Sequence, residues 1–387
     1  MSSRKALRFG MFMPPLHRPG TNPDVAFENN LTLLEHLDRL GFDEAWIGEH
    51  HSGGVELIDS PEIFIAIAAQ RTKHIKLGTG VTSLPYHHPL TVAQRIVQLD
   101  YMTRGRIMFG AGPGQLISDA SMFGIESRDL RPRLNESLDV VMRLFNGETV
   151  TKVGAGFTCD NAKLHLLPYS NFDKVVTSAI TPSGPKLAGT HGIGMLTLTA
   201  TNQQALDVLA SQWDIATETA AANGKTVNRS DWRMAGIMHL AATAEEARRD
   251  VHFGIESLFK YLRHIVPAAM PPETKTTNEL IDIINETGLG VIGTPEDAVR
   301  AIKRLQEKSG GFGSFLVQGG DFASFDATLR SYRLFAEEVI PHFTGLADST
   351  KASFEEFVES TTHVAKVQEG LTAAFEQYEK EKATVGG

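Results

Sequence analysis

The residues best suited to chemistry in this chain are Glu49, His50 and His51, which directly follow a short apolar segment at 44–48. An apolar run of that length predicts a buried parallel strand, and parallel sheets present chemistry at the carboxyl ends of their strands. Imidazole titrates near neutral pH, so one of these histidines could act as a general acid or base. Adjacent side chains of an extended segment point to opposite faces, so one histidine at most should face a shared site. The structural alternative is a pair of rings that satisfies backbone hydrogen bonds.

Metal binding is a further possible role for these histidines. It would require ligands that converge from several strand ends, and the candidates by position are His17, His87, His88, His191 and His239. The chain contains no H-x-H or H-E-x-x-H pattern, so a metal-dependent hydrolase is kept as an alternative and no metal ligand is predicted. The single cysteine, Cys159, excludes an internal disulfide and a thiolate metal cage.

Two glycine-bearing segments could hold a ligand. The first contains Gly112 and Gly114 in a G-x-G-x-G pattern interrupted by a proline, which is not a dinucleotide-binding fingerprint. Glycines there would let the backbone lie flat against a planar ligand, and a plain tight turn is the alternative. The second contains Thr181, Ser183 and Gly184, whose hydroxyl groups and free amides suit an anion such as phosphate. A capped helix without a ligand would also explain it.

The elements that would position these residues alternate between strand-like and helix-period segments. Residues 24–40, for example, carry apolar side chains three and four apart and stop at Gly41, which predicts a helix. The expected strands are 7–13, 44–48, 75–81, 106–110, 175–180, 195–200, 232–240 and 315–318. Eight strands in this alternation favour an α/β fold, a closed (β/α)8 TIM barrel.

Insertions and an extension complete the predicted organisation. Residues 147–168 suggest a hairpin, and 263–292, which contain three prolines, are interpreted as a lid. A helix over 244–262 is expected just before that lid. The barrel domain is placed at 1–343 and a C-terminal helical extension at 344–387, with an apolar stripe predicted to dock on the barrel or on a sister subunit.

Composition limits the classes of partner. The 387 residues are 42% hydrophobic and 21% charged, with a net charge of -9 that is spread along the chain. This pattern gives no electrostatic footprint for nucleic acid or anionic lipid and favours a small-molecule partner. No segment approaches the roughly 20 apolar residues needed to cross a bilayer, and Met1–Ala6 carry no apolar signal core. The protein is therefore expected to be cytoplasmic.

Several motifs taken together resemble the bacterial luciferase-like flavin-dependent monooxygenases over about residues 7–343. They are Phe9-Gly10-x-Phe12, Gly41-Phe42 through Glu49-His50-His51, Leu77-Gly78-Thr79-Gly80-Val81, His88-Pro89, Leu99-Asp100 through Phe109-Gly110, and Ile292 through Glu296. Within that family, Pro182-Ser183-Gly184 and Leu164 through Pro168 are most similar to the limonene 1,2-monooxygenase subgroup.

The resemblance implies a cofactor and assigns roles. It implies a luciferase-like barrel that binds reduced FMN, supplied by a separate NADH-dependent flavin reductase, with O2 as cosubstrate and a homodimeric assembly. His50 matches the family's catalytic histidine, which is expected to hydrogen-bond the flavin peroxide or to assist proton transfer, with Glu49 and His51 as supporting neighbours. Gly80-Val81 match an unusual cis peptide beneath the flavin ring, and Thr181, Ser183 and Gly184 match its phosphate-binding turn. The segment 263–292 coincides with the family's mobile loop.

Two departures from the family pattern narrow the range of reactions and cofactors expected for this protein. Gly112 and Pro113 stand where luciferase itself has a cysteine and an arginine, so aldehyde chemistry and light emission are not expected. Glu49-His50-His51 stand where deazaflavin-using relatives carry an acidic-histidine pair, which favours FMN.

We therefore expect an enzyme that oxygenates, by epoxidation, a small apolar substrate such as the monoterpene limonene. The substrate pocket expected from position alone is formed by Phe12, His17, Phe123 and Met238. The alternatives are a deazaflavin (F420)-dependent dehydrogenase on the same barrel, a metal-dependent hydrolase, and a protein that stores flavin or senses a ligand without turnover.

Overall fold

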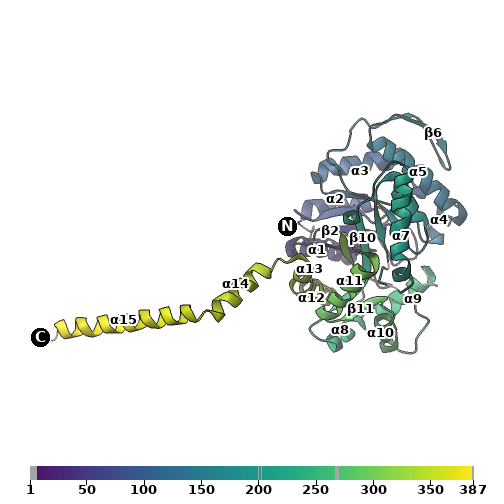
Figure 1. The fold of residues 1–387 in the computed structure, drawn as a ribbon. Helices are drawn as coiled ribbons and strands as arrows, with labels where there is room; N and C mark the ends of the chain where they lie inside the picture. The colour runs from purple at the N-terminus through teal and green to yellow at the C-terminus, as the bar shows by residue number, and fades with distance from the viewer. Residues whose placement is uncertain (1–6, 199, 202, 266–269, 386–387) are drawn as a thin grey trace. The chain divides into compact units, whose positions relative to one another are not determined.

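The computed structural model describes residues 7–385 except 199, 202 and 266–269, and Figure 1 shows the course of the chain. Met1–Ala6, for which no signal core was expected, lie outside the described residues. The chain divides into two compact units, Met1–Ile340 and Pro341–Gly387. The first unit carries the parallel sheet, and the second consists of helices.

Eight parallel strands close into a barrel in the first unit. They are β1 (Arg8–Met13), β2 (Glu44–Ile47), β3 (Lys76–Thr79), β5 (Ile107–Gly112), β8 (Lys174–Ser178), β9 (Gly194–Thr197), β10 (Trp232–Leu240) and β12 (Ser314–Gln318). Each strand pairs with the next in this order, and β12 returns to pair with β1. The predicted (β/α)8 barrel is confirmed, and each expected strand overlaps an observed one.

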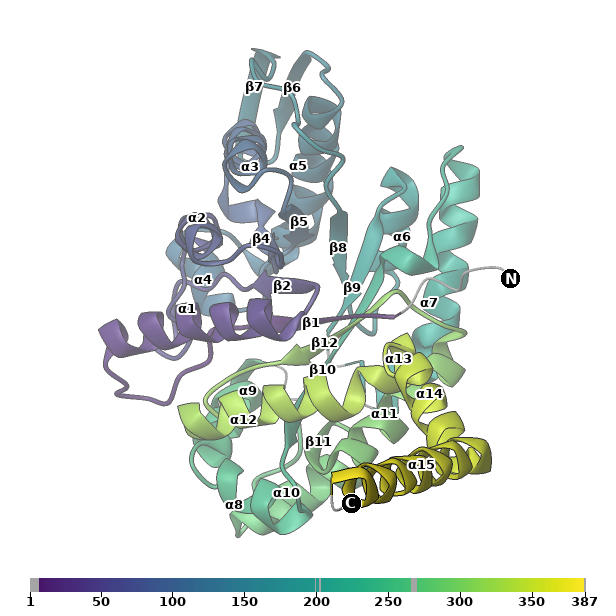
Figure 2. The ribbon, with the colours of Figure 1, turned by 90° about the vertical axis from the view of Figure 1, so that its left-hand side faces the viewer.

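Helices surround this barrel, as Figure 2 shows for α1, α2, α3, α5 and α12. The helices that follow the barrel strands are α1 (Pro23–Leu40), α2 (Pro61–Arg71), α3 (Pro89–Thr103), α5 (Leu130–Phe145), α6 (Ser183–His191), α7 (Gln203–Ala222), α11 (Pro295–Ser309) and α12 (Phe325–Leu334). In α1 the side chain of Asn22 caps the first turn, and Gly41 ends the helix with φ of 81°. Within the described part of the chain, no helix is long and apolar enough to cross a membrane.

The secondary structure just before the predicted lid differs from the expected single helix. The helix expected over 244–262 is two helices, α8 (Ala244–Val251) and α9 (Ile255–Ile265). They separate at Gly254, where a Cβ atom would lie 1.9 Å from the carbonyl oxygen of Asp321, so the backbones approach too closely for any side chain. The chain bends here because only glycine permits that approach.

The predicted lid, residues 263–292, is more regular than its prolines suggested. It contains α10 (Thr277–Glu286), and β11 (Gly290–Gly293) adds to β10 in parallel as an extra strand. Leu280, Ile281 and Ile284 of α10 are buried. Residues 266–269, also part of the predicted lid, lie outside the described residues.

The predicted hairpin is present, and the C-terminal unit is helical. Strands β6 (Val150–Gly154) and β7 (Phe157–Ala162) pair in an antiparallel manner within 147–168. The second unit comprises α13 (Pro341–Thr344), α14 (Asp348–Glu359) and α15 (Thr361–Val385). The stripe of α15 is exposed at Val364, Val367, Leu371, Phe375 and Tyr378. Its docking on the barrel or on a sister subunit stays a prediction.

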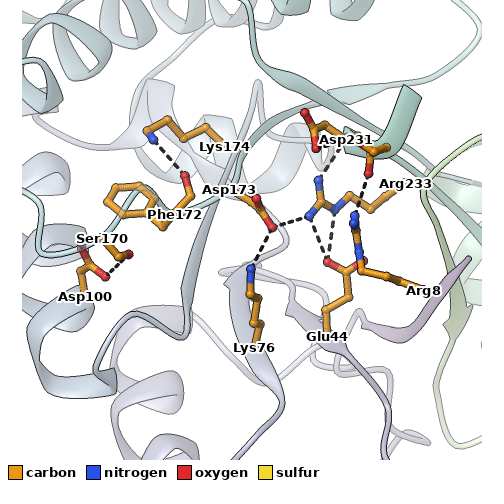
Figure 3. A network of polar contacts seen from close by, with 11 residues as sticks. Arg8, Glu44, Lys76, Asp100, Ser170, Phe172, Asp173, Lys174, Asp231 and Arg233 are labelled. Atoms are coloured by element: carbon orange, nitrogen blue, oxygen red, sulfur yellow. Dashed lines mark hydrogen bonds and ion pairs between the residues drawn. The ribbon is translucent and has the colours of Figure 1, made fainter. Parts of the chain in front are cut away.

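A network of charged side chains joins the amino ends of the strands, as shown in Figure 3. The side chain of Arg233 is fully buried and lies between Glu44 and Asp173, with Nη2 3.1 Å from Glu44 Oε2 and 2.7 Å from Asp173 Oδ2. Lys76 reaches the same carboxylate of Asp173 at 3.4 Å, and Arg8 lies 3.8 Å from Glu44 Oε1. Arg8, Glu44 and Lys76 each begin a barrel strand, so the network fixes the floor of the barrel.

Candidate active site

A cavity opens at the carboxyl ends of the strands, opposite that floor. Its wall includes residues from the ends of β1, β2, β3, β5 and β8. Among the residues predicted from sequence, it is lined by Phe12, Glu49, His50, Gly80, Val81, Gly114, Thr181, Ser183 and Gly184. Enzymes built on this barrel place their active sites at the same end.

His50 lies at the wall between two carboxyl groups. Its Nδ1 is 2.9 Å from Oδ2 of Asp119, on the short helix α4 (Ile117–Met122), and its Nε2 is 3.4 Å from Oε2 of Glu56. Burial alone would lower the pKa of His50, but attraction by Glu56 and Asp119 raises it above the ordinary value. His50 is thus oriented by one carboxylate and faces the cavity beside another.

Glu49 organises the neighbouring histidines. Its Oε1 lies 3.0 Å from Nε2 of His51 and 2.8 Å from Nε2 of His87, and its Oε2 accepts a hydrogen bond from the amide of Ser83. Burial opposes ionisation, but these hydrogen bonds together hold the pKa of Glu49 below its usual value. The same carboxylate raises the pKa of His87, against the effect of burial.

The ligand atoms of Glu49, His51 and His87 lie within 4.8 Å of one another, a spacing that could admit a metal ion. Both imidazoles, however, approach the same carboxylate oxygen at hydrogen-bonding distance. Each ring therefore carries a proton on Nε2, the atom that a metal would need free. Glu49, His51 and His87 therefore form a hydrogen-bonded group that supports the cavity wall, and no metal is assigned to them.

Glu56 and Asp119 were not singled out from the sequence. The side chain of Glu56 is 3% exposed, and burial raises its pKa to about 7, while His50 and Tyr261 act in the opposite direction. A carboxyl group between Val55 and Leu57 is a signal that could have identified it, because an acidic residue in an apolar stretch needs a partner. Asp119 stands between Ser118 and Ala120 and offers no comparable signal.

Glycines shape one face of the cavity. The peptide bond between Gly80 and Val81 is cis. Gly112 is not among the described residues that line the cavity, but a Cβ atom there would lie 2.4 Å from Cγ2 of Val81, so it supports the wall from behind. Gly114 has φ of 81°, and its Cβ would lie 2.2 Å from the hydroxyl of Tyr86. The face is therefore formed by backbone, which suits a planar ligand.

A second group of residues that line the cavity suits an anion. The hydroxyl oxygens of Thr181 and Ser183 lie 2.9 Å apart at the start of α6, whose first amides face outward from the helix. A Cβ atom on Gly184 would lie 2.4 Å from the carbonyl oxygen of Thr177, so the turn packs directly on β8. Arg131 lines the same cavity. Hydroxyl groups, a helix start and a guanidinium group together fit a phosphate monoester.

His51 and Phe123, both predicted for the site, lie beside the cavity rather than on its described wall. The ring of Phe123 stacks on Tyr86 with centroids 4.8 Å apart and meets the ring of His51 edge-on at 4.9 Å. As expected for adjacent residues, His50 and His51 face different surroundings. Phe123 is 44% exposed and covers His51.

His17 and Met238, predicted for the substrate pocket, also lie away from the described cavity wall. Both ring nitrogens of His17 are used, since Nδ1 lies 3.1 Å from Asp321 and Nε2 lies 3.0 Å from the amide nitrogen of Asn30. Met238 is buried within β10. His17 therefore links α1 to the loop after β12, and Met238 contributes to packing.

Comparisons with known proteins agree with this architecture. A family model described as luciferase-like monooxygenase matches residues 7–311. The chain is 52% identical over 377 residues to limonene 1,2-monooxygenase of Rhodococcus erythropolis, which covers 97% of each chain. It is 41% identical over 357 residues to 4-hydroxyprotoasukamycin monooxygenase of Streptomyces nodosus subsp. asukaensis, which covers 90% of this chain and 95% of that relative.

A solved structure extends the comparison to a bound cofactor. The oxygenating constituent of 3,6-diketocamphane monooxygenase from Pseudomonas putida, solved in complex with FMN, matches with a TM-score of 0.70 and 25% identity, covering 87% of this chain and 98% of that one. The chain therefore belongs to the luciferase-like monooxygenase family, and it is an oxidoreductase of the monooxygenase class. The resemblance drawn from the motifs is confirmed.

Proposed function

We propose that this protein is the oxygenase of a two-component system, which uses reduced FMN and O2 to epoxidise a small apolar alkene such as the monoterpene limonene. The observation that carries the proposal is one cavity that joins His50, the backbone face at Gly80–Val81 and the anion-binding turn at Thr181–Gly184. The identity of 52% to limonene 1,2-monooxygenase supports the choice of substrate class.

The residues of the cavity divide the binding of FMN between them. Thr181, Ser183 and Arg131 would hold the phosphate, because hydroxyl and guanidinium donors match its oxygens. Gly80, Val81 and Gly114 would lie against the ring system, where the lack of side chains allows close approach. When bound, reduced FMN supplies the electrons that activate O2.

The chain itself supplies proton control and an apolar environment. His50 holds a proton at Nε2 on the cavity wall, while Asp119 fixes its ring through Nδ1. Glu49 stabilises the cavity wall by accepting a hydrogen bond from the backbone amide of Ser83. Phe12, Val81, Leu134, Leu187 and Leu198 add apolar lining, which favours a hydrocarbon substrate over a polar one.

The remaining assignments follow from the same proposal. Reduced FMN comes from a separate NADH-dependent reductase, and the protein works as a homodimer in the cytoplasm. The segment 263–292 acts as the lid that excludes water during turnover. The relative solved with FMN supports this cofactor over a deazaflavin.

Replacing Arg131 with methionine should weaken FMN binding by roughly tenfold, the loss expected for one charge-assisted hydrogen bond. Riboflavin, which lacks the phosphate, should bind the variant and the wild type equally. Fluorescence titration with both ligands measures this difference. Arg128→Met is the matched control, because Arg128 is exposed and is not among the described residues that line the cavity. Equal losses for FMN and riboflavin would contradict the phosphate assignment.

The function as a whole is tested by product analysis. The protein is mixed with O2, a panel of monoterpenes and a reductase that supplies reduced FMN, and products are identified by mass. We expect one oxygen atom from labelled O2 in an epoxide. Absence of oxygenated product, with reduction of a deazaflavin in the presence of an alcohol instead, would overturn the proposal.

A further inference from the structure

Glu56 is held rigidly in a loop that connects β2 to α2. Its backbone forms an isolated antiparallel bridge with Leu16, and the neighbouring carbonyl of Val55 accepts a hydrogen bond from the amide of His17 at 2.9 Å. Gly53, with φ of 82°, passes so close to Tyr261 that a Cβ atom would lie 2.9 Å from its ring. The loop therefore fixes the carboxyl group of Glu56 between the cavity and α9.

The carboxyl group of Glu56 has two different sides. Its Oε1 accepts a hydrogen bond from the hydroxyl of Tyr261 at 3.3 Å. Its Oε2 is buried, accepts no hydrogen bond from any residue that the structure describes, and lies 3.4 Å from Nε2 of His50. A buried carboxylate with one hydrogen bond is poorly solvated, so the neutral acid is favoured there.

We propose that Glu56, in its protonated form, is the proton reserve of His50, and that it restores to Nε2 of His50 the proton that His50 delivers into the cavity. This inference rests on the proposed function for the identity of the acceptor, which is an oxygen atom of the reactants. It adds Glu56 as a proton donor and Tyr261 as a positioning residue.

The proton balance is closed within these groups and water. His50 gives the proton on Nε2 to the acceptor oxygen, and the O–H bond of Glu56 then breaks as a new N–H bond forms on Nε2. The resulting carboxylate keeps the hydrogen bond from Tyr261. A proton from water restores the neutral carboxyl group of Glu56, and no electron is transferred in any of these steps.

The charged and titratable groups around the pair favour this exchange near neutral pH. Glu49, Glu56 and Asp119 all act on His50 and raise its pKa, against burial. The pKa of Glu56 is raised to about 7, because burial and the charge of Asp119 together outweigh the lowering by His50 and by the hydroxyl of Tyr261. Burial beside Glu56 also raises the pKa of Tyr261, so its phenol stays a donor. Both groups can therefore hold a proton near neutral pH.

The experiment measures protonation directly, in the protein without flavin. Infrared difference spectra across pH should show a protonated buried carboxyl group that titrates near pH 7 and is absent in Glu56→Gln. Ring resonances of His50, assigned by their loss in His50→Ala, should titrate at lower pH in Glu56→Gln, because an attracting charge is removed. With flavin and substrate supplied, turnover of Glu56→Gln should fall by roughly 100-fold.

A second variant and a control keep the result interpretable. Tyr261→Phe removes a hydrogen bond that lowers the pKa of Glu56, so its infrared transition should move to higher pH. Glu62→Gln is the matched control, because Glu62 is also a buried glutamate but is not among the described residues that line the cavity. It should leave both the infrared transition and the His50 titration unchanged.

Two outcomes would overturn the proposal. One is an infrared band that persists in Glu56→Gln, and the other is a His50 titration that is identical in Glu56→Gln and the wild type. Because both measurements use flavin-free protein, they remain valid if no monoterpene is oxygenated. A failure of the proposed function would appear in the product assay, whereas a failure of this inference would appear in the spectra.

Discussion

Replacing His50 with alanine should lower the rate of product formation by about 10²–10⁴-fold, the range lost when a general acid or base is removed. The reason is local, because Nε2 of His50 faces the cavity beside Glu56 and Asp119 holds the ring in place. FMN affinity should stay close to that of the wild type, since the phosphate turn lies elsewhere on the wall. Turnover with a constant supply of reduced FMN, together with a fluorescence titration, measures the two effects separately.

His74→Ala is the matched control, because the side chain of His74 is exposed and its fixed contact is the backbone amide that binds Asp38. It should turn over at the rate of the wild type. Should His50→Ala keep its full rate, or should it lose FMN binding in proportion to activity, His50 has no role in proton transfer.

Replacing Arg233 with methionine should lower the free energy of unfolding by about 3–5 kcal/mol, the usual cost of removing one partner from a buried ion pair. The variant leaves Glu44 buried, with its attraction to Arg233 gone and Arg8 3.8 Å away. Burial disfavours the charge on Asp173, and Arg233 is the first group that holds its pKa below the usual value. Urea denaturation of both proteins measures the difference.

Arg8→Met is the comparison for that result. Arg8 contacts the same glutamate but is partly exposed, so the expected loss is about 1 kcal/mol or less. Equal losses for the two variants would mean that burial of the pair does not determine the energy. A loss below about 1 kcal/mol for Arg233→Met would show that Glu44 and Asp173 are solvated in the variant.

The strands could be predicted because each carries its own signal. Strand β10 matches its expected bounds, because most of its nine buried residues are apolar and this local pattern marks a strand without knowledge of the rest of the fold. The break at Gly254 could not be predicted, because it depends on the carbonyl of Asp321, which is distant in sequence. Strand β11 was also missed, because Gly290–Gly293 carries only two apolar side chains and lies at the end of the segment that its prolines led us to interpret as a lid.

The site was predicted where residues are adjacent in sequence and missed where the fold brings them together. Glu49 and His50 follow β2 directly, and both line the cavity. Asp119 reaches His50 across 69 positions of sequence. His17 and Met238 were chosen because they lie near strands, but a position near a strand does not determine which way a side chain points.

The network of ion pairs around Arg233 stabilises the amino ends of the barrel strands, whereas the cavity for ligands lies at their carboxyl ends. Because ion pairs join the strands at their amino ends, substitutions at the carboxyl ends should leave the closed barrel intact. Exchanging Phe12 or Leu198 for smaller or larger apolar residues should therefore change which substrates are accepted. This scaffold should be well suited to directed evolution of new monooxygenases.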